Sequence, residues 1–229
     1  DREVAPGWDR SPDALVWSRD GKTLYATAQD VGQKSLFAID VATGKVRTIV
    51  NEGMVNSPAL AAGGRLLFLL DHLRSPAELV SVRTDGSDPV RVTRINDARL
   101  AEVRMGDGEQ MSFAGAEGDT VYAYVVKPAD FDPARKYPVA FLVHGGPQGS
   151  FSNQWHYRWS PQVYAGRGYA VVMVDFHGST GYGQAFTDAI RGDWGGKPLV
   201  DLQKGLAAAI EAYPWLDGDR VCARGAAYG

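Results

Sequence analysis

Cysteine is nearly missing from this sequence: Cys222 is the single one among 229 residues. One cysteine excludes an internal disulfide and a cysteine-based zinc framework. Cys222 lies in an apolar run before a glycine-rich turn, so we expect a buried structural thiol rather than a reactive one. No metal or cofactor is predicted, since the histidines lack metal-ligand spacing and are expected to be structural. These histidines are His72, His144, His156 and His177.

Long apolar runs and an excess of charge of one sign are also missing. No stretch reaches the roughly 18 apolar residues of a membrane-spanning helix, and the first residues contain no apolar signal-peptide core. The formal net charge of −3 leaves no basic footprint for nucleic acid. Hydrophobic residues make up 45% and charged residues 22% of the sequence, as in globular proteins. We therefore expect neither nucleic acid nor a membrane as a partner.

The first part of the sequence, from Ser11 to about Arg94, is typical of β-hairpins, because short β-rich segments alternate with Asp-Gly and Thr-Gly turns. The second four of its predicted strands repeat the first four after about 45 residues, the spacing of propeller blades. A β-sandwich is the alternative. Two blades cannot close a ring, so we expect earlier blades in a longer polypeptide. The predicted strands are 14–17, 23–28, 35–40, 46–50, 57–60, 66–70, 78–82 and 90–93.

The pattern changes after a bridging segment that starts at Glu102. Continuous apolar strands alternate there with helical segments, which predicts an α/β domain with a mostly parallel sheet. The amphipathic spacing is clearest in the last helix. The predicted strands are 121–126, 137–144, 169–175 and 220–224, and the predicted helices are 160–167 and 197–213.

Residues 225–229, Gly-Ala-Ala-Tyr-Gly, follow directly on the last predicted strand. They match the Gly-x-Ser-x-Gly nucleophile elbow of α/β-hydrolases except at the centre, where Ala227 stands. Residues 144–147, His-Gly-Gly-Pro, end an earlier apolar strand, where this fold builds the other part of its oxyanion hole. A glycine N–H of that loop and the N–H of Tyr228 are the expected donors to the oxyanion.

Four motifs occur in order along the second half of the sequence. Besides the two above, they are residues 178–183, Gly-Ser-Thr-Gly-Tyr-Gly, and residues 192–196, Gly-Asp-Trp-Gly-Gly. Together they resemble the prolyl oligopeptidase family, in its acylaminoacyl-peptidase and dipeptidyl-peptidase branch. The resemblance implies that residues 1–100 are the last blades of an N-terminal β-propeller. It also implies that residues 101–229 are the first part of an α/β-hydrolase domain, truncated at the nucleophile elbow.

The resemblance further implies a serine exopeptidase that releases dipeptides or acylated amino acids from short peptides through an acyl-enzyme. Ala227 matches the nucleophile position, and Gly146 and Tyr228 match the oxyanion-hole donors. The triad's Asp and His follow the serine in this fold and would lie after residue 229, in the remainder of the same polypeptide. Family members often form homo-oligomers. A bacterial cytoplasm or periplasm is the expected compartment.

The alanine at the nucleophile position predicts an inactive chain and has two interpretations. We favour an engineered serine-to-alanine change, because every other feature of the elbow persists. The alternative is a natural pseudo-hydrolase that binds peptides without cleavage. A further interpretation keeps the enzyme but gives it a small ester as substrate. Two residues depart from the family pattern: His177 stands where arginine is usual, and Arg224 is unexpected in an apolar strand. The aromatic segment 155–159 fits either a substrate pocket or packing.

Overall fold

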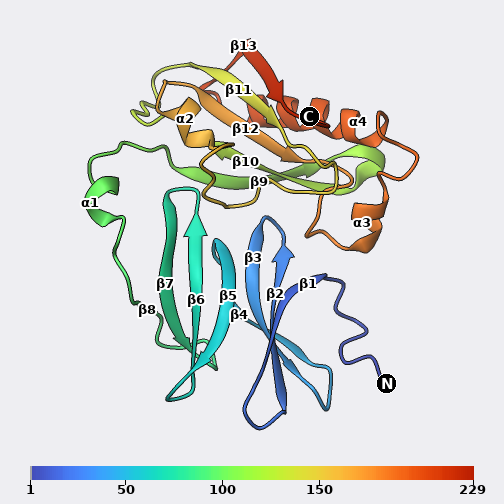
Figure 1. Cartoon of the computed structure of the whole chain (residues 1–229). Helices are drawn as coiled ribbons and strands as arrows, with labels where there is room; N and C mark the ends of the chain where they lie inside the picture. The colour runs from blue at the N-terminus through green and yellow to red at the C-terminus, as the bar shows by residue number, and fades with distance from the viewer. Residues whose placement is uncertain (1) are drawn as a thin grey trace. The chain divides into compact units, whose positions relative to one another are not determined.

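The computed structural model describes residues 2–229 and divides them into two compact units. The first unit runs to Leu100 and includes Ser152–Trp155, and the second comprises Ala101–Phe151 and His156–Gly229. Strands β1–β8 and helix α1 (Asp97–Leu100) belong to the first unit, and strands β9–β13 with helices α2–α4 to the second (Figure 1).

The first unit is built from two antiparallel four-stranded meanders. Neighbouring strands pair antiparallel within each meander, and a single parallel pair, Lys34 with Met54, joins β3 to β5. Every strand predicted here is present, although β8 ends at Arg91 rather than at Thr93. The strands are β1 (Pro12–Trp17), β2 (Thr23–Asp30), β3 (Gln33–Asp40), β4 (Val46–Val50), β5 (Met54–Ala61), β6 (Arg65–His72), β7 (Ser75–Arg83) and β8 (Val90–Arg91).

The hairpin turns use the glycines that the sequence indicated. Gly21, Gly44 and Gly86 have φ values of 67°, 72° and 93°, in the region that favours glycine. At Gly44 a Cβ atom would in addition lie 2.4 Å from the Val4 carbonyl oxygen. With the register fixed by these turns, alternate side chains form one core. Its buried members are Tyr25, Leu36, Ala38, Val55, Leu66, Phe68 and Val82.

Glu78 on β7 is a buried carboxylate that holds the segment following β8. It is 3% exposed and accepts hydrogen bonds from the Thr93 hydroxyl, from the Ile95 N–H at 3.2 Å, and from the Asn96 N–H at 2.9 Å. Burial alone raises the pKa of Glu78, but these bonds to the charged form outweigh burial and lower the pKa to about 2.

A Glu78→Gln substitution should lower the free energy of unfolding at neutral pH by about 1–3 kcal/mol, because the amide turns N–H groups toward backbone donors. The depressed pKa means that Glu78 stabilises the fold above its unfolded value of 4.5, and that this stabilisation is lost as the pH falls toward about 2. Urea denaturation across this range tests the prediction, with the exposed Glu52→Gln as control. A difference that stays constant down to the folded pKa would contradict it.

The second unit contains a five-stranded mixed sheet of order β13–β11–β12–β10–β9. Strand β11 is parallel to β12 and β13, whereas β10 is antiparallel to β12 and to β9. The prediction of a mostly parallel sheet is therefore wrong for the described strands. The reason is the hairpin β9–β10, whose short connection at Ala116–Gly118 allows only antiparallel pairing. The strands are β9 (Gly108–Ala114), β10 (Thr120–Val126), β11 (Tyr137–Val143), β12 (Ala170–Asp175) and β13 (Leu216–Gly225).

Three helices accompany this sheet: α2 (Pro161–Ala165), α3 (Gln184–Asp188) and α4 (Lys197–Ala212). Helix α4 confirms the predicted amphipathic helix. It packs so closely on the sheet that a Cβ atom on Gly205 would lie 2.7 Å from side-chain atoms of Phe113 and Val174. Within residues 2–229, no helix has both the length and the apolar character needed to cross a bilayer.

Within the described residues Cys222 is exposed on β13, which differs from the expectation of a buried thiol. β13 is the end strand of the described sheet, and most of its residues are exposed. A strand with a neighbour on one side only keeps more of its surface in water, which an apolar run in the sequence cannot reveal. Arg224 on the same strand is also exposed, and nothing in the structure explains its presence.

Candidate active site

Residues 225–229 form a sharp turn at the end of β13. Ala227 at its centre is exposed and has a φ of 58°, a left-handed conformation that costs free energy for any residue with a side chain. The flanking glycines have no room for side chains. A Cβ atom on Gly225 would lie 2.2 Å from the carbonyl carbon of Gly229, and one on Gly229 would lie 2.1 Å from the Val143 carbonyl oxygen. The turn thus has the strained geometry of a nucleophile elbow.

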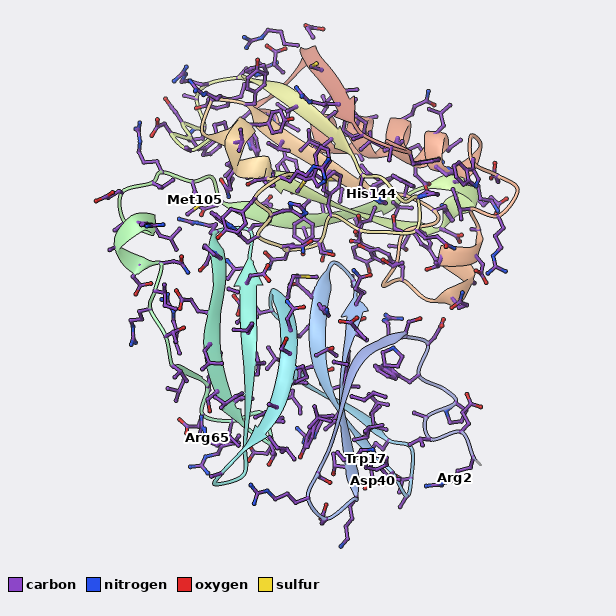
Figure 2. The ribbon with its side chains drawn as sticks, in the orientation of Figure 1. Arg2, Trp17, Asp40, Arg65, Met105 and His144 are labelled. Carbon is purple, nitrogen blue, oxygen red and sulfur yellow. The ribbon has the colours of Figure 1, made fainter. Side chains whose placement is uncertain are left out.

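The loop that follows β11 lies against this turn. It begins with the buried His144, which Figure 2 labels. A Cβ atom on Gly145 would lie 2.9 Å from the Ala226 carbonyl oxygen and 3.3 Å from Ala227 Cβ. Glycine therefore permits this close approach. Gly146, the predicted oxyanion-hole residue, follows directly and has a φ of 130°.

Tyr228, the second predicted donor, is held by its own side chain. Its hydroxyl donates a hydrogen bond to the Trp194 carbonyl. Its ring centroid lies 5.4 Å from that of Phe176 and 5.5 Å from that of Trp194. Burial raises the pKa of Tyr228, and the negative charge of Asp193 raises it further. These contacts restrain the backbone that carries the predicted donor.

Asp175, the last residue of β12, anchors the far end of the loop. It is 3% exposed, and its Oδ2 accepts hydrogen bonds from the Ser150 hydroxyl at 2.5 Å and the Tyr182 hydroxyl at 2.6 Å. Its Oδ1 accepts from the Phe151 N–H at 3.1 Å. Burial raises the pKa of Tyr182 well above its ordinary value, and the adjacent Asp175 charge adds to this.

His144 connects the start of the loop to the same region. Its Nε2 lies 2.8 Å from the Ser179 hydroxyl and 3.6 Å from Asp175 Oδ1. Its Nδ1 lies 2.8 Å from the Gly145 carbonyl oxygen. The imidazole also stacks on Phe176 with a centroid distance of 4.2 Å. The ring is thereby fixed on both edges and on one face.

His177 stands where arginine is usual, and both of its ring nitrogens lie within hydrogen-bond distance of a carboxylate. Its Nδ1 lies 2.6 Å from Oδ2 of the fully buried Asp201, and its Nε2 lies 3.1 Å from Asp119 Oδ2. Asp201 also accepts from the His177 N–H at 2.7 Å and the Ala116 N–H at 2.8 Å. The histidine therefore joins the end of β12 to α4 and to the β9–β10 connection.

A His177→Ala substitution should destabilise the protein by about 2–3 kcal/mol, because the buried Asp201 carboxylate keeps only its two backbone donors. His177→Arg should recover most of this loss. Asp119→Ala, which removes a partner with a 61% exposed side chain, should cost less than about 1 kcal/mol. Urea denaturation of the three variants measures these differences. Equal losses for His177→Ala and Asp119→Ala would contradict the assignment.

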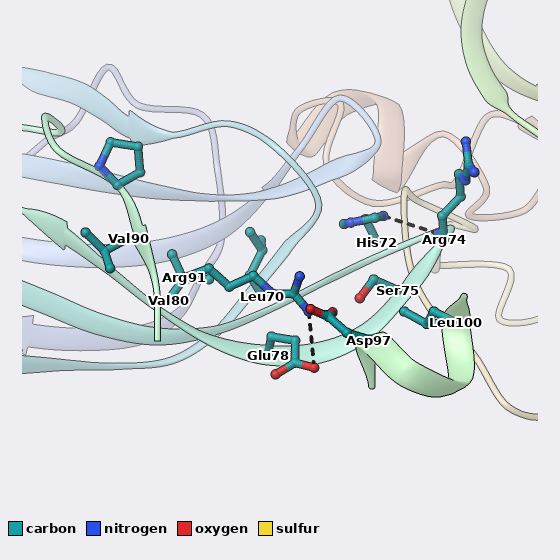
Figure 3. Close-up of a pocket in the computed structure, with 11 residues that line it drawn as sticks. Leu70, His72, Arg74, Ser75, Glu78, Val80, Val90, Arg91, Asp97 and Leu100 are labelled. Carbon is teal, nitrogen blue, oxygen red and sulfur yellow. Dashed lines mark hydrogen bonds and ion pairs between the residues drawn. The ribbon is translucent and has the colours of Figure 1, made fainter. Parts of the chain in front are cut away.

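The remaining candidates carry no comparable chemistry. In a cavity of about 550 Å³ in the first unit, the lining residue Arg91 pairs with two lining carboxylates, Glu78 at 3.4 Å and Asp97 (Figure 3). In the aromatic segment 155–159, Tyr157 and Trp159 are exposed. Within the part of the chain that the structure describes, no group of three or more His, Cys, Asp or Glu side chains is placed to hold a metal ion.

Sequence reasoning missed Asp175, Tyr182 and Asp201. Asp175 carried a usable signal, since a charged residue ending an apolar strand of an α/β sheet stands at the edge where such folds place functional groups. Tyr182 lay inside a recognised motif without an assigned contact. Asp201 had no signal, because a carboxylate in an amphipathic helix is usually on the solvent face.

Residues 155–229 match the model of the prolyl oligopeptidase family. "Dipeptidyl-peptidase 5" of Schizosaccharomyces pombe is 35% identical over 235 residues, covering 100% of this chain and 33% of that protein. "Probable dipeptidyl-peptidase 5" of Arthroderma benhamiae is 36% identical over 233 residues, covering 100% of this chain and 32% of that protein. The chain thus spans about a third of the length of the curated relatives it matches.

Solved structures are similar across the whole chain. An acylaminoacyl peptidase of Pyrococcus horikoshii matches with a TM-score of 0.83 and 25% identity, covering 98% of this chain and 35% of that one. Dipeptidyl peptidase 4 of Porphyromonas gingivalis matches with a TM-score of 0.73 and 23% identity, covering 100% of this chain and 33% of that one. The second likeness shows the fold alone.

The expectation of a bacterial compartment is wrong. The curated relatives named above are fungal, from Schizosaccharomyces pombe and Arthroderma benhamiae. The expectation rested on a resemblance to a family, and the motifs that carry this resemblance contain no information about the source organism.

Proposed function

The chain belongs to the prolyl oligopeptidase family, and from this premise we propose that it is part of a serine exopeptidase that releases dipeptides or acylated amino acids from short peptides. The observation that carries the proposal is the turn at Ala227, strained at φ 58° between two glycines and contacted by Gly145. An exposed residue in that conformation is where an α/β-hydrolase presents its nucleophile. The relatives' names indicate the exopeptidase class.

In the proposed reaction, a serine hydroxyl at position 227 attacks the peptide carbonyl and forms an acyl-enzyme as the amine leaves. The negative charge that develops on the carbonyl oxygen is stabilised by the N–H groups of Gly146 and Tyr228. The triad's His would take the serine proton and pass it to the leaving amine, with the triad's Asp orienting this His, and water would then hydrolyse the acyl-enzyme. Both residues follow the nucleophile in this fold and would lie after residue 229. With Ala227 in place the attacking hydroxyl is missing, so this chain is expected not to cleave the peptides that it binds.

The first unit is proposed to be two blades of an N-terminal propeller that admits extended peptides to the active site and excludes bulky substrates. Its two four-stranded meanders support this assignment, as does the coverage of about a third of the relatives' length, which leaves sequence for further blades. Homo-oligomer formation is proposed from the family resemblance alone.

Two alternatives from other functional classes remain. A natural pseudo-hydrolase would keep the elbow geometry for binding, and a small-ester hydrolase would keep the chemistry with another substrate. The source gene separates engineered from natural alanine, because a serine codon at position 227 would eliminate the pseudo-hydrolase.

The test uses the full open reading frame that encodes this chain, with and without Ala227→Ser. Both proteins are assayed with dipeptidyl anilides, acyl-aminoacyl anilides and short-chain esters. Cleavage of a dipeptidyl or acyl-aminoacyl anilide by the Ala227→Ser protein alone supports the proposal. Cleavage of esters only supports the small-ester hydrolase, and no cleavage by either protein supports the pseudo-hydrolase.

A further inference from the structure

We propose that His144 is a positioning residue that orients the Gly145–Gly146 peptide of the oxyanion hole, and that Ser179 and Asp175 hold its ring for this purpose. The proposal rests on the proposed function, which makes the Gly146 N–H a donor to the oxyanion. It assigns a role to the 178–183 motif, which the proposed function leaves without one.

A single peptide bond links the imidazole of His144 to the predicted oxyanion donor. The Gly145 carbonyl oxygen lies 2.8 Å from His144 Nδ1, and a carbonyl oxygen can only accept, so this nitrogen carries the proton. The carbonyl and the Gly146 N–H belong to the same planar trans peptide, in which they point in opposite directions. The imidazole therefore sets the direction of the Gly146 N–H by holding the opposite end of its peptide.

The imidazole of His144 is held by residues on both sides of its ring. Its Nε2 is 2.8 Å from the Ser179 hydroxyl and 3.6 Å from Asp175 Oδ1, and its face stacks on Phe176 with an interplanar angle of 12°. A neutral ring accepts a hydrogen bond from Ser179 at Nε2, whereas a charged ring donates there and is attracted to Asp175. In both states Nδ1 carries a proton and donates a hydrogen bond to the Gly145 carbonyl oxygen.

The rest of the loop after β11 is held by the same group of residues. Asp175 also accepts hydrogen bonds from the Ser150 hydroxyl and the Phe151 N–H. The same carboxylate that faces His144 therefore fixes the opposite end of the loop. In the 178–183 motif, the Thr180 N–H donates to the Gly149 carbonyl at 2.9 Å, and the Tyr182 hydroxyl holds Asp175. The motif thus contacts both the middle of the loop and the two side chains that restrain its ends.

The test compares variants in the full-length protein carrying Ala227→Ser. His144→Phe keeps an aromatic ring that can stack on Phe176 but removes both nitrogens. We expect kcat to fall about 10²-fold, because the Gly146 N–H is no longer held in the direction of the oxyanion. Ser179→Ala should lower kcat about 3- to 10-fold. Ser112→Ala, which removes an exposed hydroxyl from β9 of the same unit, should leave kcat unchanged.

A merely structural role would give a different pattern. The dissociation constant of a peptide substrate, measured calorimetrically on the Ala227 protein, should change less than about twofold with His144→Phe, since the effect is confined to the transition state. In the His144→Phe background, Ser179→Ala should have no further effect, because Ser179 acts through the imidazole. An unchanged kcat in His144→Phe, or a full Ser179→Ala effect in that background, would overturn the proposal. If His144→Phe does not fold, kcat and the peptide dissociation constant of the Ser179→Ala variant decide the question. A lower kcat with an unchanged dissociation constant supports the proposal, and an unchanged kcat overturns it.

A structural readout keeps this proposal separate from the proposed function. If the Ala227→Ser parent hydrolyses nothing, the proposed function fails. Crystal structures of the Ala227 protein with and without His144→Phe then still test the positioning. A rotated Gly145–Gly146 peptide in the variant supports the role of His144, and an unchanged peptide overturns it.

Discussion

An Ala227→Ser substitution should raise kcat for hydrolysis of a cognate peptide anilide by about 10⁶-fold, the factor that a serine protease loses with its nucleophile. The elbow geometry is already present, because the residue at position 227 holds its left-handed conformation with alanine. Adding one hydroxyl oxygen to an exposed residue requires no repacking.

The measurement is steady-state kinetics on the full open reading frame, and the matched control is Ala226→Ser. This control adds the same hydroxyl one residue earlier, outside the centre of the elbow, and should restore nothing. KM should stay similar between the Ala227→Ser protein and the unsubstituted protein, since the hydroxyl acts in the transition state. Activity below about 10²-fold over the unsubstituted protein would count against position 227 as the nucleophile position.

A Gly145→Ala substitution in the Ala227→Ser protein should lower kcat by about 10²–10³-fold, the factor associated with loss of one oxyanion donor. A Cβ atom there would lie 2.9 Å from the Ala226 carbonyl oxygen, closer than real Cβ atoms approach. Because that obstacle is backbone, the loop or the turn must move, and a displacement of about 1 Å at a catalytic group costs about 10²-fold.

Gly195→Ala is the matched control for this prediction, because a Cβ atom at Gly195 meets nothing within 4 Å. It makes the same chemical change in the motif 192–196, next to Trp194, and should leave kcat within about twofold of the parent. Thermal denaturation accompanies the kinetics, so that a loss of folding is recognised. A folded Gly145→Ala protein with the parental kcat would show that the contact between loop and turn is irrelevant to catalysis.

Features that depend on local backbone conformation were predictable from the sequence. The hairpin turns were indicated by Gly21, Gly44 and Gly86, whose positive φ values explain why glycine stands there. The sharp turn at residues 225–229 was predictable for the same reason, since Gly225 and Gly229 have no space for a side chain. In each case one residue type is required by a conformation that the neighbouring residues imply.

Features that depend on what a segment meets in space were not predictable. Cys222 lies in an apolar run, yet its burial depends on whether another element covers β13, and that surface is exposed. The direction of β10 depends on its hairpin with β9, and β9 itself was hidden in a polar segment. The partners of Asp175 and His177 come from distant elements, and a single sequence does not pair them.

The most direct test of the central claim, that position 227 is the nucleophile position of a serine hydrolase, is covalent capture. The full-length protein with and without Ala227→Ser is incubated with a fluorophosphonate, and its intact mass and proteolytic peptides are measured. We expect one phosphonyl adduct in the Ala227→Ser protein, located in the peptide that contains position 227, and none in the unsubstituted protein. A folded Ala227→Ser protein that gains no adduct, or an adduct at another residue in both proteins, would contradict the account.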